Sequence, residues 1–310
     1  WTHVAMDAAE VDALMARMRP PLRALRDEFN AADRSQNDDL IDFAAVLSFS
    51  ISDTMGIEAG IARKNRAPSH QERYLWLPLE STAGLADGNL YIGDVNLDSE
   101  TAWQFELGFG WHTERVDFTP RMFYHHVDDY IQGVAASDPR VIMIATMNGD
   151  PTPLRFANVE AKLWGIDAEW AVALAPRWQL GGIVSWVRGE RRDVDDELFR
   201  IAPFNTLIDL SYEREQWSVT LEGEFYARQD NVSRINEETK SPGYGLLNLY
   251  AQYDFAANGL TLTGGIENIL DKKYRPHLNG INRVNASDVA IGERIPGDGI
   301  NAFVQASWTF

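Results

Sequence analysis

The amino-acid sequence predicts an all-β fold, an antiparallel β-barrel that spans a membrane. The last residues, 300–310, alternate apolar with mostly polar side chains, as a strand with one apolar face does. The same alternation recurs in about eleven segments of roughly ten residues, a length that crosses a bilayer at a tilt. Short turns and long loops alternate between these segments. A β-sandwich or a propeller shows no such alternation of connection length.

The expected strands form pairs that are joined by short turns and separated by long loops. They cover residues 40–51, 55–64, 103–111, 117–131, 156–174, 179–191, 199–212, 217–229, 244–255, 260–268 and 300–310. If the long loops are extracellular, strand parity places residue 39 outside the cell and the C-terminus in the periplasm. A self-contained single-chain barrel has an even number of strands. The odd count predicts that residues 40–310 form the C-terminal half of a larger barrel.

Two of the expected strands define the two faces of this barrel. In residues 103–111, large apolar side chains alternate with Gln104, Glu106 and two glycines. In residues 217–229, Glu222, Glu224 and Arg228 lie opposite an apolar face. Carboxylates in the middle of a strand need water. We therefore expect Glu106, Glu222, Glu224 and Arg228 to face an aqueous lumen, where they could line the route of a cation.

Residues 1–39 differ from the rest of the chain and predict a long extracellular loop with short helices. Asp7 followed by Glu10 is typical of a helix start, and apolar residues then recur at helical spacing. Pro20 and Pro21 are expected to stop this helix. A second short helical piece is expected around residues 22–29.

Composition narrows the possible classes of function. With 46 acidic against 28 basic residues and a net charge of -18, the chain lacks the basic surface that nucleic-acid binding needs. The absence of cysteine excludes disulfides, thiolate metal sites and cysteine catalysis. No run of 18 apolar residues occurs, so no transmembrane helix is expected. The chain begins with Trp1 and shows no signal peptide, which predicts a processed chain or a part of one.

The segment 265–274, GIENILDKKY, resembles a signature of TonB-dependent outer-membrane receptors that leads into their last extracellular loop. The positions that match the signature are Gly265, Asn268, Asp271 and Tyr274. The final strand of that family ends in an aromatic residue, as this chain does at Phe310. The resemblance covers about residues 40 to 310.

Two further segments are similar to motifs of the same family. Arg66 and Pro68, followed by Glu72, match an Arg-Ala-Pro box. Residues 92–100 resemble an Asn-Leu box in which the usual Asn and two Pro are replaced by Asp94, Val95 and Ser99. This second loop could therefore turn differently from its counterpart in the family.

The resemblance implies a barrel of about 22 strands around an N-terminal plug, in the outer membrane of a Gram-negative bacterium. It implies import of a metal ion or a metal chelate, such as a siderophore complex or haem, driven by the TonB complex through the plug. Neither the plug nor a TonB-contacting peptide is expected in these residues. The four lumen-facing side chains could then contact the plug. Expected partners also include outer-membrane lipid and lipopolysaccharide; no enzyme activity and no resident cofactor are expected.

The segment 125–129 is the densest set of candidate metal ligands. His125, His126, Asp128 and Asp129 combine imidazole and carboxylate groups that suit a transition metal. Strand alternation sends adjacent histidines to opposite faces unless the strand bulges. The alternative is one lumenal histidine, one histidine in the interfacial girdle and a solvated acid pair.

Other candidate contacts lie in the expected loops. The resemblance implies that His70, between the two boxes, could be an axial ligand of haem, although Asn65 stands where haem receptors usually have an aromatic residue. His277 with Arg275 could contact an anionic ligand. Arg191 and Arg192, next to several aspartates, could bind lipopolysaccharide through divalent ions. Each of these residues could instead be a loop residue without a ligand.

The sequence offers two alternatives to an importer. A passive, substrate-selective porin would share the lipid-facing pattern, but it would not be expected to carry the C-terminal signature. An outer-membrane hydrolase needs a serine close to a histidine and an orienting acid. No serine in the sequence has a recognisable neighbourhood of that kind.

Overall fold

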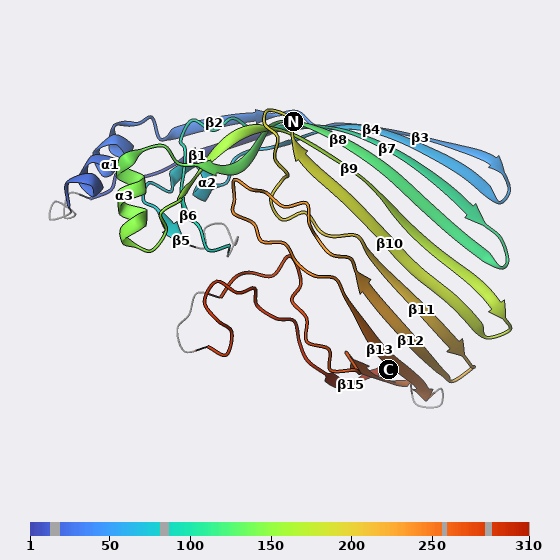
Figure 1. Ribbon diagram of the computed structural model, residues 1–310. Helices are drawn as coiled ribbons and strands as arrows, with labels where there is room; N and C mark the ends of the chain where they lie inside the picture. The colour runs from blue at the N-terminus through green and yellow to red at the C-terminus, as the bar shows by residue number, and fades with distance from the viewer. Residues whose placement is uncertain (13–18, 81–86, 256–258, 283–286, 310) are drawn as a thin grey trace.

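The computed structural model describes residues 1–12, 19–80, 87–255, 259–282 and 287–309. Its main feature is a curved antiparallel sheet whose strands lie side by side in chain order (Figure 1). The sheet has 13 strands, and all but β5 and β6 form one continuous path from β3 to β15. We call these eleven strands the wall. The predicted transmembrane β architecture is confirmed, as part of a barrel.

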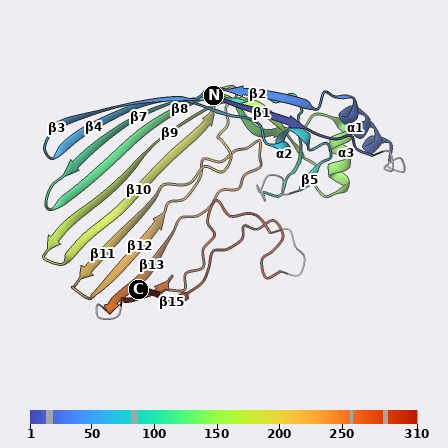
Figure 2. The ribbon, with the colours of Figure 1, turned by 180° about the vertical axis from the view of Figure 1, so that it is seen from behind.

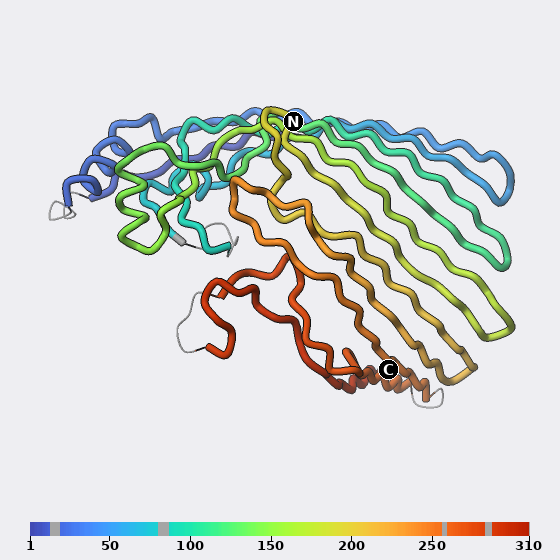
Figure 3. Tube along the Cα trace, in the orientation of Figure 1, coloured from blue at the N-terminus to red at the C-terminus, as the bar shows by residue number. Residues whose placement is uncertain are grey.

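The wall strands agree with the expected segments in number and order. Their bounds are β3 (Phe43–Ser52), β4 (Met55–Arg66), β7 (Glu100–His112), β8 (Val116–Ala135), β9 (Leu154–Ala175), β10 (Trp178–Arg191), β11 (Asn205–Glu213), β12 (Trp217–Tyr226), β13 (Tyr244–Phe255), β14 (Leu260–Glu267) and β15 (Asn301–Trp308). Short turns lie at one end of the wall and long connections at the other, as the trace in Figure 3 shows. We call these the turn end and the loop end.

Most strand bounds differ from the expected ones by a few residues, and two of these differences are explained below. Strand β11 begins at Asn205 rather than near residue 199. Pro203 precedes it and has no N–H to donate to a ladder. Strand β12 ends at Tyr226, so Arg228 lies beyond the strand rather than on its inner face. The Arg228 side chain is instead paired with Asp230 at 2.8 Å and is two-thirds exposed.

The register of the strands sorts the wall side chains onto two faces. Leu221 lies between Leu210 and Leu249 of the neighbouring strands and is 42% exposed. On the opposite face, Glu222 lies between Asp209 and Asn248. A wide, exposed apolar face is unfavourable in water and is typical of contact with lipid. We call the apolar face outer and the polar face inner.

The segments at the loop end form a small layer of their own, which we call the loop unit (Figure 2). Its elements are β1 (Thr2–Asp7), α1 (Pro20–Ala31), β2 (Ser35–Leu40), α2 (His70–Tyr74), β5 (Leu79–Glu80), β6 (Leu90–Ile92) and α3 (Pro139–Met147). Helix α1 packs on α3 through Leu25, Val141 and Ile144. No helix in the described part of the chain is both long and apolar enough to cross a membrane.

Of the two helices expected near the N-terminus, the second is present as α1, and most of the first lies outside the described residues. Residues up to Asp7 form strand β1, which pairs with β2, and residues 8–12 are not helical. The rest of that expected helix, residues 13–18, lies outside the described residues, as does Phe310. Pro20 and Pro21 begin α1 instead of ending a helix. A proline at the first helical positions costs nothing, because the N–H there has no intrahelical partner.

Strands β8 and β9 run from the wall into the loop unit. A bulge interrupts their pairing between Val127 and Tyr130, and Asp129 adopts a φ of 58°. Beyond β10, strand β9 pairs in parallel with β6, where Tyr91 lies opposite Leu154. Tyr91 and Leu154 are almost fully buried in the apolar core of the loop unit. The loop unit is therefore a continuation of the wall.

Candidate functional site

The inner face carries exposed carboxylates in its first half. Strands β4 and β7 place Glu58 and Glu106 in adjacent positions, and β8 places Arg121 beside them. Arg121 donates to both carboxylates at 3.0 Å. These side chains are about half exposed, so the ion pairs contribute little stability. Their effect is to present charge to the enclosed space.

A second carboxylate pair lies on β12. Both Glu222 and Glu224 accept hydrogen bonds from the Asn248 amide, at 2.9 and 2.8 Å. Asn248 is 2% exposed, so its amide is fixed in place. Its side-chain oxygen accepts the backbone N–H of Asn268 at 2.9 Å. Asn248 thus connects the two glutamates to Asn268, where the last long connection begins.

Asn268 and Asp271 of the C-terminal signature have identifiable structural roles. Asn268 adopts a φ of 47° and is 3% exposed. Its side chain bonds both backbone groups of Lys272, at 2.8 and 2.9 Å, and the Asp298 carbonyl at 3.1 Å. Asp271 accepts the backbone N–H of Ile300 at 3.1 Å. These two residues close the last connection at its base.

Gly265 and Tyr274 of the same signature act through packing. A Cβ on Gly265 would lie 2.5 Å from the Phe303 ring, so only glycine fits there. The Tyr274 ring occupies the space where a side chain on Gly297 would be. Tyr274 also packs on Tyr244 at 4.7 Å between ring centroids, which places an aromatic stack near the loop end of the inner face.

Arg66 of the Arg-Ala-Pro box is the centre of an ion-pair cluster. Its guanidinium bonds Glu100 at 2.6 Å and Glu72 at 2.9 Å, and Pro68 is fully buried beside them. Ser69 caps helix α2 and donates its backbone N–H to Glu72. Burial raises the pKa of Glu72, but the bonds from Arg66 and Ser69 outweigh burial and lower it below the usual range. The box is therefore a scaffold that fixes the base of the loop unit.

Arg73, which follows Glu72 in α2, forms the most buried arginine–carboxylate pair in the described residues. It bonds both oxygens of Asp38, at 2.6 and 2.7 Å, and the two side chains are 2% and 6% exposed. Arg73 also donates to the Leu97 carbonyl, and Ser99 donates to Asp38. Burial raises the pKa of Asp38, yet the bonds from Arg73 and Ser99 hold it below its ordinary value. Sequence reasoning missed this pair because both partners lie in expected loops.

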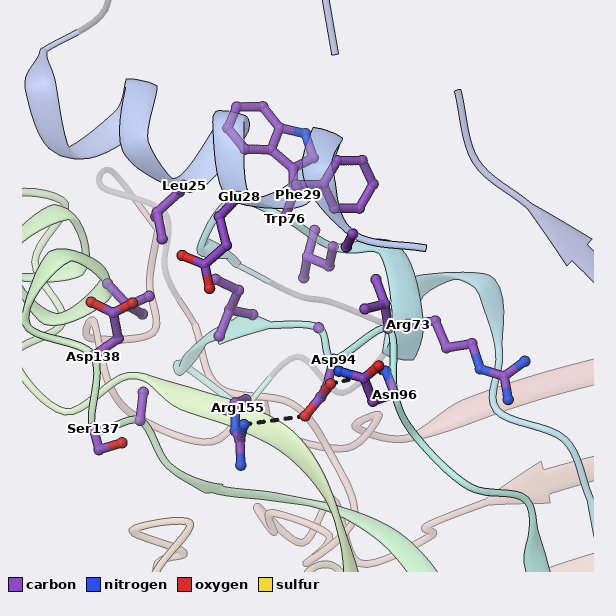
Figure 4. Close-up of a pocket in the computed structure, with 17 residues that line it drawn as sticks. Leu25, Glu28, Phe29, Arg73, Trp76, Asp94, Asn96, Ser137, Asp138 and Arg155 are labelled. Atoms are coloured by element: carbon purple, nitrogen blue, oxygen red, sulfur yellow. Dashed lines mark hydrogen bonds and ion pairs between the residues drawn. The ribbon is translucent and has the colours of Figure 1, made fainter. Parts of the chain in front are cut away.

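A pocket of about 330 Å³ lies between α1, α3 and the chain after β6. Figure 4 shows the Glu28 carboxylate directed into the space between α1 and β6. Across the pocket, Asp94 of the altered Asn-Leu box pairs with Arg155 at 3.1 Å (Figure 4). The walls between these charged groups include Phe29 and Trp76. The pocket is amphipathic and belongs to the loop unit.

The structure places His125 and His126 on opposite faces, because the bulge follows them. His125 lies on the inner face against the Phe123 ring at 5.1 Å, and its Nε2 atom is buried without a hydrogen-bond partner in the described residues. His126 lies on the outer face, 3.4 Å from Asp128. Asp128 is paired with Arg192 at 2.7 Å, and Asp129 occupies the bulge. These four residues do not converge on one point.

His70 and His277 are also far from a shared site. His70 is exposed at the start of α2, and its ring packs at a tilt against Tyr74, with 4.8 Å between the ring centroids. His277 is buried, and its two ring nitrogens lie 3.0 Å from Ser241 and from Glu238. Within the described ranges, no three His, Asp or Glu side chains gather as a metal site requires.

The Ser241, His277 and Glu238 cluster has the residue types of a hydrolase triad but lacks access. Ser241 is 5% exposed, and the adjacent cavity, of about 20 Å³, has room for roughly one water molecule. Arg294 closes the cluster by donating to the His277 carbonyl and to the Thr239 carbonyl. We assign this cluster to loop anchoring.

The different positions of the two adjacent histidines lead to a prediction. In a metal titration of the complete polypeptide, His125→Ala is expected to weaken Cu²⁺ binding by about tenfold, or about 1.4 kcal/mol, if the inner face holds the metal. His126→Ala is the matched control and should leave the affinity unchanged, because its ring faces outward. Equal effects of both substitutions, or no effect of either, would show that His125 does not bind the metal ion.

The wall geometry defines the class of protein. Antiparallel strands with an apolar exposed face, a polar inner face and alternating short and long connections form part of an outer-membrane-type β-barrel. Residues 23–269, most of the chain, match the family model described as TonB dependent receptor-like, beta-barrel. The chain belongs to this family.

Several solved structures share the fold. The copper transporter OprC is 20% identical, with a TM-score of 0.75 over 90% of this chain and 40% of its own. A mutant of the ferric enterobactin receptor PfeA from Pseudomonas aeruginosa is 17% identical, with a TM-score of 0.63 over 88% and 40%. The siderophore receptor PirA from the same organism is 19% identical, with a TM-score of 0.57 over 86% and 41%. The chain thus spans about 40% of the length of these proteins.

Proposed function

We propose that this chain is the C-terminal part of the barrel of an outer-membrane receptor that imports a metal ion or a metal chelate. Family membership supports an active receptor, and the names of the neighbouring structures supply the cargo classes, copper and ferric siderophores. The energy would come from the TonB complex, acting through a plug inside the barrel. The family match and the neighbours give a passive porin no support.

The observation that carries the proposal is the carboxylate-rich inner face. Glu58, Glu106, Glu222 and Glu224 all face the enclosed space, and Arg121 is the one basic side chain that the described wall contacts place among them. Carboxylates are hard oxygen ligands that attract cations. The same groups can accept hydrogen bonds from a plug. Both roles favour a positively charged partner over an anionic one.

Cellular uptake tests the proposal. Cells that produce the complete protein should accumulate labelled Cu²⁺ or a labelled ferric siderophore in a saturable way. A protonophore is expected to reduce this uptake to the level of cells that lack the protein, because the transport step needs energy from the inner membrane. Uptake that persists with the protonophore and does not saturate would indicate a passive channel.

A further inference from the structure

The segment after β6, where the chain departs from the Asn-Leu box, forms one wall of the pocket beside α1. Gly93 lies directly against α2, because a Cβ there would be 2.8 Å from the Glu72 carbonyl oxygen. The backbone N–H groups of Gly93 and Asp94 bond carbonyls in and just after α2 at 2.7 and 2.9 Å. The two Asp94 carboxylate oxygens accept from Arg155 at 3.1 Å and from the Asn96 N–H at 3.0 Å. This wall is therefore fixed in place.

The rest of the pocket lining is largely apolar and comes mainly from the two packed helices. Leu25 of α1 and Val141 of α3 are 5% and 2% exposed and belong to the same buried cluster. Phe29 of α1 and Trp76, which follows α2, add aromatic side chains. The volume of about 330 Å³ is at the lower end of the range for small-molecule sites. This size and lining suit a compact molecule with an apolar or aromatic body.

The charged groups around this pocket do not balance. Arg73 and Arg155, which line it, each pair with one carboxylate. Arg140 instead serves two carboxylates, because its Nη2 atom bonds both Glu28 and Asp138 at 2.5 Å. The bonds from Arg140 hold the pKa of Asp138 below its ordinary value, so Asp138 stays ionised. Among the described lining groups and their ion-pair partners, one negative charge is therefore left without a cation.

Glu28 is the accessible member of this charged set. Its side chain is 65% exposed, against 30% for Asp138, and its carboxylate points into the pocket (Figure 4). Its Oε2 atom accepts from Arg140, while its Oε1 atom has no hydrogen-bond partner in the described part of the chain. An ammonium group can bond such an oxygen and also lie against an aromatic ring. The pocket thus combines an open carboxylate with an apolar, partly aromatic lining.

We propose that this pocket binds a small organic cation, an amine whose ammonium group bonds Glu28 while its apolar or aromatic body packs between Phe29, Trp76 and Val141. The uncompensated negative charge favours a ligand with a single positive charge. An anion of the same shape would meet the Glu28 carboxylate without a free cation to offset the repulsion. The site lies within the loop unit, so the inference is independent of the proposed import function and of its cargo.

Equilibrium dialysis of the complete polypeptide in detergent against labelled tryptamine tests the inference. Tryptamine has an indole body and one ammonium group at neutral pH. We expect saturable binding to the wild type and binding about tenfold weaker to Glu28→Gln, because glutamine keeps the shape of the side chain but removes its charge. Trp76→Leu should also weaken binding, because it removes an aromatic face while keeping an apolar side chain.

Asp27→Asn is the matched control variant, because Asp27 neighbours Glu28 in α1 but pairs with Arg26 and does not line the pocket. It should bind tryptamine like the wild type. Tryptophol, with a hydroxyl in place of the ammonium group, and indole-3-propionate, an anion, should each bind the wild type at least tenfold more weakly than tryptamine. This comparison of ligands needs no substitution, so it tests the proposal even if a variant is unstable.

Three results would overturn the proposal. They are the absence of saturable tryptamine binding to the wild type, equal tryptamine affinities of the wild type and a folded Glu28→Gln variant, and equal affinities of the wild type for tryptamine and indole-3-propionate. The thermal unfolding midpoint without ligand shows whether the variant is folded. Uptake of metal by cells is a separate measurement, so failure of the importer function would leave these results unaffected.

Discussion

Replacing Arg73 with alanine is expected to destabilise the complete protein by about 3 to 5 kcal/mol, because the substitution leaves the Asp38 carboxylate buried without its partner. The side chain of Asp38 is 6% exposed, so water cannot replace the two lost bonds. The loop unit should unfold first and become sensitive to protease. Denaturant unfolding combined with limited proteolysis measures both effects.

Two further variants distinguish the effect of breaking a buried ion pair from the effect of removing a charge alone. Arg140→Ala breaks the pair with Glu28, whose carboxylate is 65% exposed, and should cost less than about 1 kcal/mol. The double variant Asp38→Leu/Arg73→Met should recover much of the lost stability, because no charge remains unpaired. If Arg73→Ala costs no more than Arg140→Ala, the buried pair does not stabilise the loop unit.

The stability that the Asp38–Arg73 pair contributes depends on pH, because the pKa of Asp38 is lowered in the folded protein. The folded-state pKa of Asp38 lies below that of the unfolded chain. The stabilisation is therefore complete above the unfolded pKa and is lost as the pH falls through the folded pKa. The stability difference between the wild type and Arg73→Ala should shrink in acid. A difference that stays constant in acid would show that the Asp38 charge is not involved.

Asn268→Ala is expected to cost about 3 kcal/mol of stability, since it combines two unfavourable changes. It removes the three hydrogen bonds that the buried Asn268 side chain makes to backbone groups of Lys272 and Asp298. It also forces alanine into a left-handed conformation that asparagine tolerates better. Thermal unfolding of the complete protein in detergent measures the loss.

A glycine at position 268 separates the loss of hydrogen bonds from the backbone strain. Asn268→Gly removes the side-chain bonds but keeps a residue that adopts positive φ freely. It should be about 1 kcal/mol less destabilising than Asn268→Ala. Asn301→Ala, which removes an exposed bond to Glu267, should have little effect. Equal stability of wild type and Asn268→Ala would contradict a structural role for this signature residue.

The strands of the wall were predictable because each has one face toward lipid and the other toward water. Leu221 and Glu222 are neighbours in the sequence, but one meets lipid and the other water, and this difference gives the alternation. The strand ends were harder to predict. Arg228 continues the polar pattern of β12 although the strand has already ended at Tyr226. Alternation alone cannot detect where the chain leaves the wall.

The loop unit was less predictable, because tertiary contacts decide its structure. Residues 35–39 are polar on both faces, yet they form most of β2 by pairing with β1. The partners Asp38 and Arg73 are separated by 35 positions. Nothing in the local pattern around either residue indicates the other. The family motifs were informative at Asn268, where the backbone adopts a positive φ, and at Arg66, whose guanidinium pairs with Glu72 and Glu100.

The continuity of β9 determines which parts of the barrel mouth can separate. Between Tyr130 and Ala135, β8 remains paired with β9, so the loop unit cannot hinge away without breaking this ladder. The later loops are joined to this region by side-chain hydrogen bonds, for example at Asn236. Asn236 is bonded to Asn89 and Gln132 through single hydrogen bonds of 3.2 and 3.1 Å. On this side the barrel mouth is therefore held together by side-chain hydrogen bonds, and on the β8–β9 side by a backbone ladder.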